Sequence, residues 1–140
     1  MEERVQAAIR EAVGREPFAR QFGIELAFLD DGRSRVEMVY DPGRQDNIYG
    51  RAHGGALFGL IDEAFETAAQ TDGTIAVAMN VNVTYIASPE PGSRLSAEAR
   101  EVSRTKRTAT YDIRLADDRG RLIAVCQALA FRTGKPIPFL

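Results

Sequence analysis

Apolar and polar residues alternate with two different periods along this chain, and the period changes from segment to segment. Apolar residues recur at helical spacing near the start, which predicts a short amphipathic helix over residues 3–13. Phe18 and Phe22, four residues apart, indicate a second short helical turn. Residues 24–29 and 34–40 then predict two strands joined by an Asp-Asp-Gly hairpin turn.

The second half of the chain has the period of two that is typical of strands. A long strand is predicted from Ile75 to Ile86, with one buried apolar face made of Val77, Met79, Val81, Val83 and Tyr85. Three more alternating segments follow, one beginning at Leu95, one around Ile113 and one over residues 121–132. The glycine and prolines after residue 133 predict a frayed tail.

The stretch from Asn47 to Gln70 follows neither pattern and lies at the centre of the chain. Pro42-Gly43 predicts a loop before it, and His53-Gly54-Gly55 leads into a predicted helix. Apolar residues cover nearly every side of that helix, which is typical of a helix buried in a core. Yet the helix also carries Asp62 and, one turn later, Glu66. Burying a carboxylate costs several kcal/mol unless it is paired, protonated or hydrated, so this conflict marks a candidate functional site.

The order of the predicted elements is β-β-α-β-β-β-β after an N-terminal helix. Long antiparallel strands with one apolar face need an element that covers this face, and the central helix is the only candidate. The sequence therefore predicts an α+β fold in which an antiparallel sheet wraps around one long central helix. The 140 residues are expected to form a single domain, 1–140.

Composition and charge exclude several classes of function. Lys and Arg number 18 against 20 Asp and Glu, a net charge of −2, which predicts neither a nucleic-acid nor a membrane partner. No apolar segment resembles a signal peptide or a membrane span, and Cys126 has no partner for a disulfide, so we expect a cytoplasmic protein. With one histidine and one cysteine the sequence predicts no metal site.

A specific set of residues in this sequence matches the motifs of a known protein family. Asn47, Gly50, His53-Gly54-Gly55, Leu57, Asp62, Ala64 and Ala68, with the later Asn82-Val83-Thr84-Tyr85 and Pro89, resemble the hotdog-fold acyl-CoA thioesterases. The resemblance is to the PaaI-like, phenylacetate-degradation branch of the 4-hydroxybenzoyl-CoA thioesterase superfamily. It covers roughly residues 20–133. It implies a hotdog fold and hydrolysis of a small or aromatic acyl-CoA. It also implies no cofactor beyond the coenzyme A of the substrate. A homodimer that pairs as a dimer of dimers is expected.

The resemblance also implies a role for each matching residue. Asp62 matches the catalytic carboxylate, and Gly54 matches the residue whose backbone N–H polarises the thioester carbonyl, with Gly55 beside it. Asn47 matches the polar side chain that positions the attacking water or the thioester. His53 matches the histidine that shapes the loop and in some relatives contacts the acyl end.

Two further substrate contacts are expected, one from the resemblance and one from the clustering of basic residues. Glu66 departs from the relatives, which often have a small or hydroxyl-bearing residue there, and it is expected beside the acyl group. Arg104, Lys106 and Arg107 lie around one predicted turn, where they could contact the phosphates of coenzyme A. An exposed strand end is the alternative interpretation of this basic cluster.

The spacing of the candidate residues leads to a prediction of its own. The start of a helix offers free N–H groups at Gly54 and Gly55, which suits an oxyanion. Asp62 lies eight residues beyond Gly54, about 12 Å along the same helix, whereas a base must act within about 3.5 Å of the reacting carbon. We therefore expect Gly54 of one subunit to face Asp62 of another in an obligate dimer. Glu63 is expected to be a solvated or interface charge.

Several alternatives remain open from the sequence. Apolar neighbours and Glu66 are expected to raise the pKa of Asp62, which could then act as general base or as nucleophile. A helix carboxylate paired with a nearby cation is the structural alternative for Asp62. A hotdog hydratase or dehydratase would depend on His53 instead. A non-catalytic acyl-CoA-binding module would bind the thioester without cleaving it.

Overall fold

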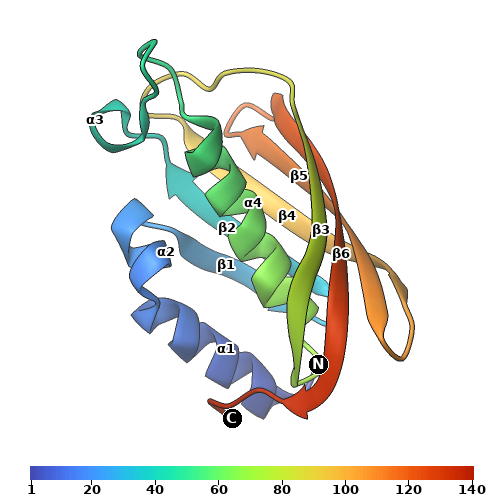
Figure 1. Ribbon diagram of the computed structural model, residues 1–140. Helices are drawn as coiled ribbons and strands as arrows, with labels where there is room; N and C mark the ends of the chain where they lie inside the picture. Colours follow the sequence, from blue (N-terminus) through green and yellow to red (C-terminus); the bar gives the residue numbers. More distant parts are fainter.

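The computed structural model describes residues 1–140 and contains one six-stranded antiparallel sheet that curves around a central helix (Figure 1). The helices are α1 (Glu3–Arg15), α2 (Pro17–Phe22), α3 (Pro42–Gln45) and α4 (Gly54–Ala69). The strands are β1 (Glu25–Asp30), β2 (Arg33–Val39), β3 (Thr74–Tyr85), β4 (Arg94–Arg104), β5 (Thr108–Asp117) and β6 (Leu122–Pro136). This architecture confirms the predicted α+β fold and its order of elements.

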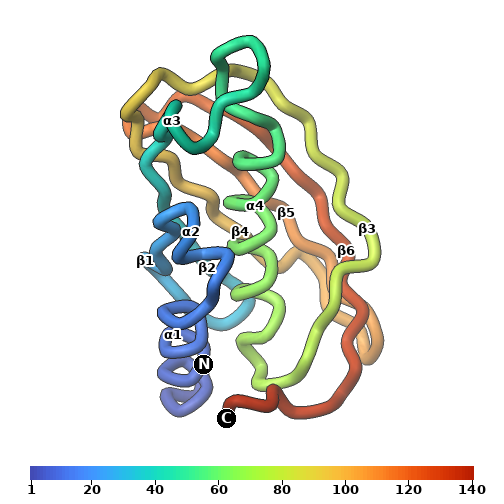
Figure 2. The backbone as a smooth tube through the Cα atoms, turned by 60° about the vertical axis from the view of Figure 1, so that its left-hand side comes forward, coloured from blue at the N-terminus to red at the C-terminus, as the bar shows by residue number.

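The strands run in the order β1-β2-β4-β5-β6-β3, which places β1 and β3 at opposite edges. Figure 2 shows α1 and α2 beside β1 and β2, with α4 in the middle of the curved sheet. Leu60, Ile61 and Ala64 of α4 have no exposed surface, because sheet residues enclose this helix. The apolar residues of α1 pack against the same core, so burial of apolar surface positions both helices. None of the helices has the length and apolarity to cross a membrane.

The region after β2 differs from the expected loop. Residues Pro42–Gln45 form the short helix α3, because the Asp41 side chain accepts a hydrogen bond from the Gly43 N–H at 2.9 Å. Pro42 occupies the first helical turn, where its missing N–H leaves no bond unmade. A Pro-Gly pair therefore starts a helix here, which the sequence pattern alone did not indicate.

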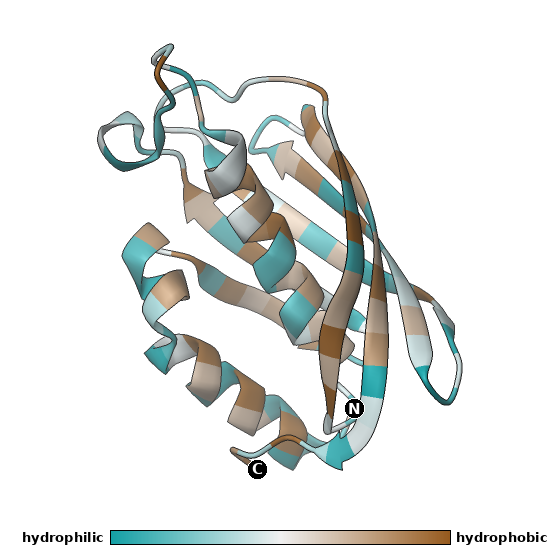
Figure 3. Ribbon diagram, viewed as in Figure 1, coloured by the Kyte–Doolittle hydropathy of each residue, from teal (hydrophilic) through white to brown (hydrophobic).

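The prediction that strand β3 has one buried apolar face is wrong. Val77, Met79 and Tyr85 are 48%, 59% and 50% exposed, and no residue of this strand is fully buried. The strand has β6 on one side only and ends the sheet, and its pairing with β6 is irregular between Ala78 and Asn80. Figure 3 shows the apolar bands that this edge strand presents. Alternation correctly indicated a strand, but it does not distinguish a strand inside the core from one at an exposed edge of the sheet.

The prediction of a frayed C-terminal tail is also wrong. Strand β6 continues to Pro136, and Ile137 is 2% exposed rather than frayed. Its backbone N–H donates to the Gly73 carbonyl at 3.0 Å, which attaches the tail to the turn after α4. Burial of one isoleucine with a backbone hydrogen bond outweighs the local tendency of the neighbouring Gly and Pro residues toward disorder.

Candidate active site

The start of α4 provides one free backbone donor. His53 is the N-cap residue of this helix, and its Nδ1 accepts a hydrogen bond from the Gly55 N–H at 2.8 Å. The Gly54 N–H donates to no group in the chain. The expectation of two free donors is therefore wrong for Gly55, because the cap occupies its N–H, while Gly54 keeps the donor at the positive end of the helix.

The loop before α4 is built around Asn47. Its side-chain oxygen accepts hydrogen bonds from the backbone N–H of Tyr49 at 2.9 Å and of Arg51 at 3.2 Å. Beside it, the Tyr40 hydroxyl donates to the Asp46 carboxylate, which attaches the loop to the end of β2. The Asn47 amide nitrogen has no partner in the chain and remains able to donate to a bound molecule.

Tyr85 is a site residue to which sequence reasoning assigned no role. Its hydroxyl donates to the Gly54 carbonyl at 3.1 Å, so the end of β3 contacts the first residue of α4. A Cβ atom added at Gly54 would lie 3.3 Å from the Tyr85 ring. The sequence contained this tyrosine within the matched Asn-Val-Thr-Tyr segment, but only the crossing of β3 and α4 brings it to the helix start.

Asp62 lies half-buried in a groove between α4 and β3. The groove has a volume of about 280 Å³ and is otherwise lined by Phe65, Glu66, Ala69, Ala76, Val77, Ala78 and Ala130. Burial raises the pKa of the Asp62 carboxyl above its usual value. No lysine or arginine lies within ion-pair distance of it, so the alternative of a helix carboxylate paired with a cation is not what the structure contains. A carboxylate in an apolar groove with a raised pKa has the properties of a general base.

Glu66 and Glu63 differ from each other in their surroundings. Glu66 lines the same groove as Asp62, and burial together with the negative charges of Glu16 and Asp62 raises its pKa to about 7. Glu63 was expected to be solvated or at an interface, but it is 2% exposed. The expectation is wrong because α1 and α2 cover the side of α4 from which Glu63 projects, and no periodicity in the sequence indicates this docking.

A single chain does not bring the two reactive groups together. Gly54 and Asp62 belong to one continuous α-helix of 16 residues. With a rise of about 1.5 Å per residue, the eight intervening steps separate the two positions by about 12 Å. The Gly54 N–H and Asp62 of one folded chain are therefore too far apart to act on the same thioester.

The basic cluster at the β4–β5 turn divides into two kinds of residue. The Arg104 guanidinium contacts Glu101 at 2.8 Å, Asp31 at 3.4 Å and Asp72 at 3.5 Å. These ion pairs weigh against a phosphate contact by Arg104. Lys106 and Arg107 are exposed and form no ion pair, so they remain candidates for such a contact.

Comparison with known proteins agrees with this arrangement. The family model described as "Thioesterase superfamily" matches residues 49–124, which include the glycine pair and Asp62. The chain belongs to the thioesterase superfamily. A putative esterase of Archaeoglobus fulgidus is 34% identical over 110 residues, covering 79% of this chain and 71% of that protein.

Members of the superfamily with a described activity are also similar to the chain. Acyl-coenzyme A thioesterase PaaI of Escherichia coli is 29% identical over 119 residues, covering 85% of this chain and 84% of that protein. The structure of the E. coli PaaI protein from the phenylacetic acid degradation operon superposes with a TM-score of 0.91 and 26% identity. That superposition covers 96% of this chain and 97% of the other, so the likeness extends beyond the sheet and α4 to the N-terminal helices.

Proposed function

We propose that this protein is an acyl-CoA thioesterase that hydrolyses a small or aromatic acyl-CoA to the free acid and coenzyme A. The observation that carries the proposal is a half-buried, unpaired Asp62 on the helix whose first residue, Gly54, has a free N–H. The similarity to PaaI, an acyl-coenzyme A thioesterase, supports this substrate class. We place the protein in the cytoplasm, in keeping with its single unpaired cysteine.

The reaction follows from the two groups. The Gly54 N–H donates to the thioester oxygen and stabilises the negative charge that develops there. Asp62 takes a proton from water, whose oxygen bonds to the thioester carbon; the C–S bond then breaks, and the thiolate leaves as coenzyme A and takes up a proton. In the alternative route the Asp62 carboxylate itself attacks, and water hydrolyses the resulting mixed anhydride. Neither route uses a metal or a redox cofactor.

The size and lining of the groove beside Asp62 support the proposal that the acyl group of the substrate is small. Its lining is largely apolar, from Phe65 and a row of alanines, and its volume of about 280 Å³ leaves room for a short chain or one ring. Glu66 lies in the same lining, so a hydroxyl or amino group on the acyl chain would find a hydrogen-bond partner there.

The site is proposed to form between two subunits. The separation of Gly54 from Asp62 within one helix requires a partner, and the exposed apolar residues of edge strand β3 offer a surface for it. A two-fold axis then makes two equal sites, each with Gly54 of one subunit and Asp62 of the other. The pairing of two such dimers remains a prediction.

Measurement of thiol release from acyl-CoA separates the candidate functions. Wild type is expected to release free thiol, and Asp62→Asn is expected to lose about 10²–10⁴-fold in turnover, because it removes the proton acceptor. Binding of acyl-CoA without thiol release would indicate a non-catalytic module. Equal rates of thiol release in wild type and Asp62→Asn would exclude the mechanism. Hydration of an enoyl-CoA without thiol release, abolished in His53→Asn and affected less in Asp62→Asn, would favour a hydratase.

Mixed dimers test whether the site is shared. Gly54→Pro removes the donor N–H, and proline suits this first helical position because His53 before it has φ −66° and ψ 132°. Gly54→Ala, which keeps the N–H but adds a Cβ, is the matched control.

Co-expressed Gly54→Pro and Asp62→Asn chains should recover about a quarter of wild-type activity, because half of the dimers contain one intact site of two. Mixtures that stay as inactive as the two parent variants would show that both groups act within one chain.

A further inference from the structure

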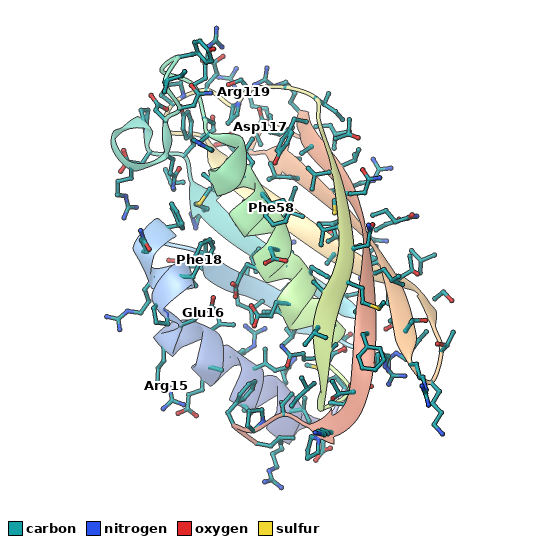
Figure 4. All side chains as sticks on the ribbon, in the orientation of Figure 1. Arg15, Glu16, Phe18, Phe58, Asp117 and Arg119 are labelled. Atoms are coloured by element: carbon teal, nitrogen blue, oxygen red, sulfur yellow. The ribbon has the colours of Figure 1, made fainter.

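Three carboxylates from separate parts of the chain converge on the side of α4 that faces α1 and α2. Glu16 lies at the junction of α1 and α2, and Glu63 and Glu66 project from α4. A carboxylate oxygen of each lies within 4.8 Å of the others. Figure 4 shows Glu16 between α1 and α2 on the side toward α4. The sequence separation of Glu16 from the other two means that only the tertiary fold creates this cluster.

The cluster lacks any positive group of its own. Glu63 is 2% exposed, and its Oε1 atom has no hydrogen-bond partner. No lysine or arginine forms an ion pair with any of the three carboxylates; Arg15, next to Glu16 in sequence, pairs instead with Glu11 at 3.1 Å. Native structures rarely leave a buried carboxylate oxygen unpaired, so this group calls for a partner.

The geometry points to a binding site for a hard divalent cation, and we propose that Glu16, Glu63 and Glu66 bind Ca²⁺. Ca²⁺ binds oxygen ligands at about 2.3–2.6 Å, so two oxygens on opposite sides of one ion lie about 4.6–5.2 Å apart. The separations within this cluster fit that limit. Carboxylates alone, without histidine or cysteine, select a hard cation rather than zinc or copper.

The surroundings allow an ion to enter and complete its coordination. A groove of about 410 Å³ between α1, the end of α4 and the C-terminal tail is lined by Glu16, Glu66, Thr67 and Gln70 among others. Water in this groove could supply the remaining ligands, as is usual for Ca²⁺. In the ion-free chain, burial and the charges of Glu16 and Glu66 raise the pKa of Glu63, so protons compete with the cation for the site.

An ion at this site would connect the α1–α2 junction to the helix that carries Asp62. Glu66 lines both this groove and the groove beside Asp62, so a bound cation would hold its carboxylate on the α1 side. The cation site shares Glu66 with the groove beside Asp62, but the proposed hydrolysis itself uses no metal. Failure of the cation proposal would therefore leave the thioesterase proposal intact.

Calorimetric titration of the chelator-treated, 140-residue protein with CaCl₂ tests the site without an activity readout. Wild type is expected to bind one Ca²⁺ per chain and to melt at a higher temperature in Ca²⁺ than in chelator. Glu63→Gln should weaken binding by about tenfold or more, because it removes one of three charged ligands. In chelator this variant should be at least as stable as wild type, since a buried acid is replaced by a neutral side chain of similar shape.

Two further variants make the test decisive. Glu16→Gln, at the more accessible helix junction, should show the same loss of affinity even if Glu63→Gln does not fold. Glu11→Gln, on the same helix α1 and outside the cluster, should bind Ca²⁺ as wild type does. The proposal is overturned if wild type shows no saturable Ca²⁺ binding, or if Glu16→Gln binds as tightly as wild type.

Discussion

At the residue scale, His53 shows how one side chain orders the start of the helix that carries the candidate site. Its Nδ1 accepts the Gly55 N–H, so the ring is oriented by the helix that it caps. Because Gly55 is occupied in this way, Gly54 is left as the single free donor at the start of α4. The same ring atom cannot accept a proton from substrate while it caps the helix, which argues for a structural role.

Replacement of His53 separates capping from catalysis. His53→Ala is expected to lower the free energy of unfolding by about 1 kcal/mol, because the Gly55 N–H loses its acceptor. His53→Asn, a good N-cap residue, should retain most of that stability and most of the turnover. Urea unfolding and thiol release measure the two effects, and a loss of about 10²-fold or more in His53→Asn would identify the histidine as an acid or base.

At the element scale, an ion-pair network joins strands β4 and β6 to the β1–β2 turn and to the turn before β3. Arg104 of β4 contacts Asp31 in the β1–β2 turn and Asp72 in the turn before β3. Arg132 of β6 also pairs with Asp72. Arg104, which the sequence suggested as a possible contact for a coenzyme A phosphate, therefore connects β4 to the β1–β2 turn and to the turn before β3. Its partners come from distant parts of the chain, so the sequence pattern did not indicate them.

The pKa of Asp72 makes this network sensitive to acid. Burial alone would raise it, but hydrogen bonds from Thr74 and Arg132 together lower the pKa of Asp72 below its usual 3.8. The stabilisation is therefore complete above that usual value and is lost as the pH falls through the lower folded-state pKa. Asp72→Asn should reduce the free energy of unfolding by about 1–3 kcal/mol at neutral pH and flatten its fall in acid.

Unfolding by urea across the acid range measures this effect, with Asp118→Asn as the control. Asp118 is an exposed aspartate in the β5–β6 turn that forms no ion pair. A pH dependence of stability in Asp72→Asn equal to that of the control would contradict the prediction.

At the scale of the whole molecule, strand β3 forms an exposed apolar edge of the sheet. Strand β3 carries partly exposed apolar side chains along its length and has no neighbour on one side. Such edges pair with other strands unless charges or bulges block them. The same edge lines the groove beside Asp62, so dimer formation and completion of the site are expected to be one event.

A charged residue on this edge should separate subunits. Met79→Lys is expected to give monomers in light-scattering measurements and to lose thioesterase activity, because a lysine cannot be buried against a second β3. Val102→Lys is the matched control, since both side chains are 59% exposed and Val102 lies on β4 away from this edge. Dimers that persist in Met79→Lys, or monomers with full activity, would refute the shared site.

The sequence by itself determined the local elements and the local chemistry of the candidate site. The spacing of apolar residues indicated the buried helix α4 and the alternating strands. The His-Gly-Gly segment indicated a helix start, and Asp62 indicated a carboxylate among apolar neighbours. These features depend on neighbours within a few residues, which the sequence contains directly.

Only the tertiary structure decided which faces are covered and by what. It left β3 exposed at an edge, buried Glu63 under α1 and α2, attached Ile137 to Gly73, and directed Arg104 toward three carboxylates. The physical reason is that burial and ion pairing depend on contacts between distant segments. Periodicity indicates that a face is apolar, but the packing of the whole chain decides whether a strand, a helix or a second subunit covers it.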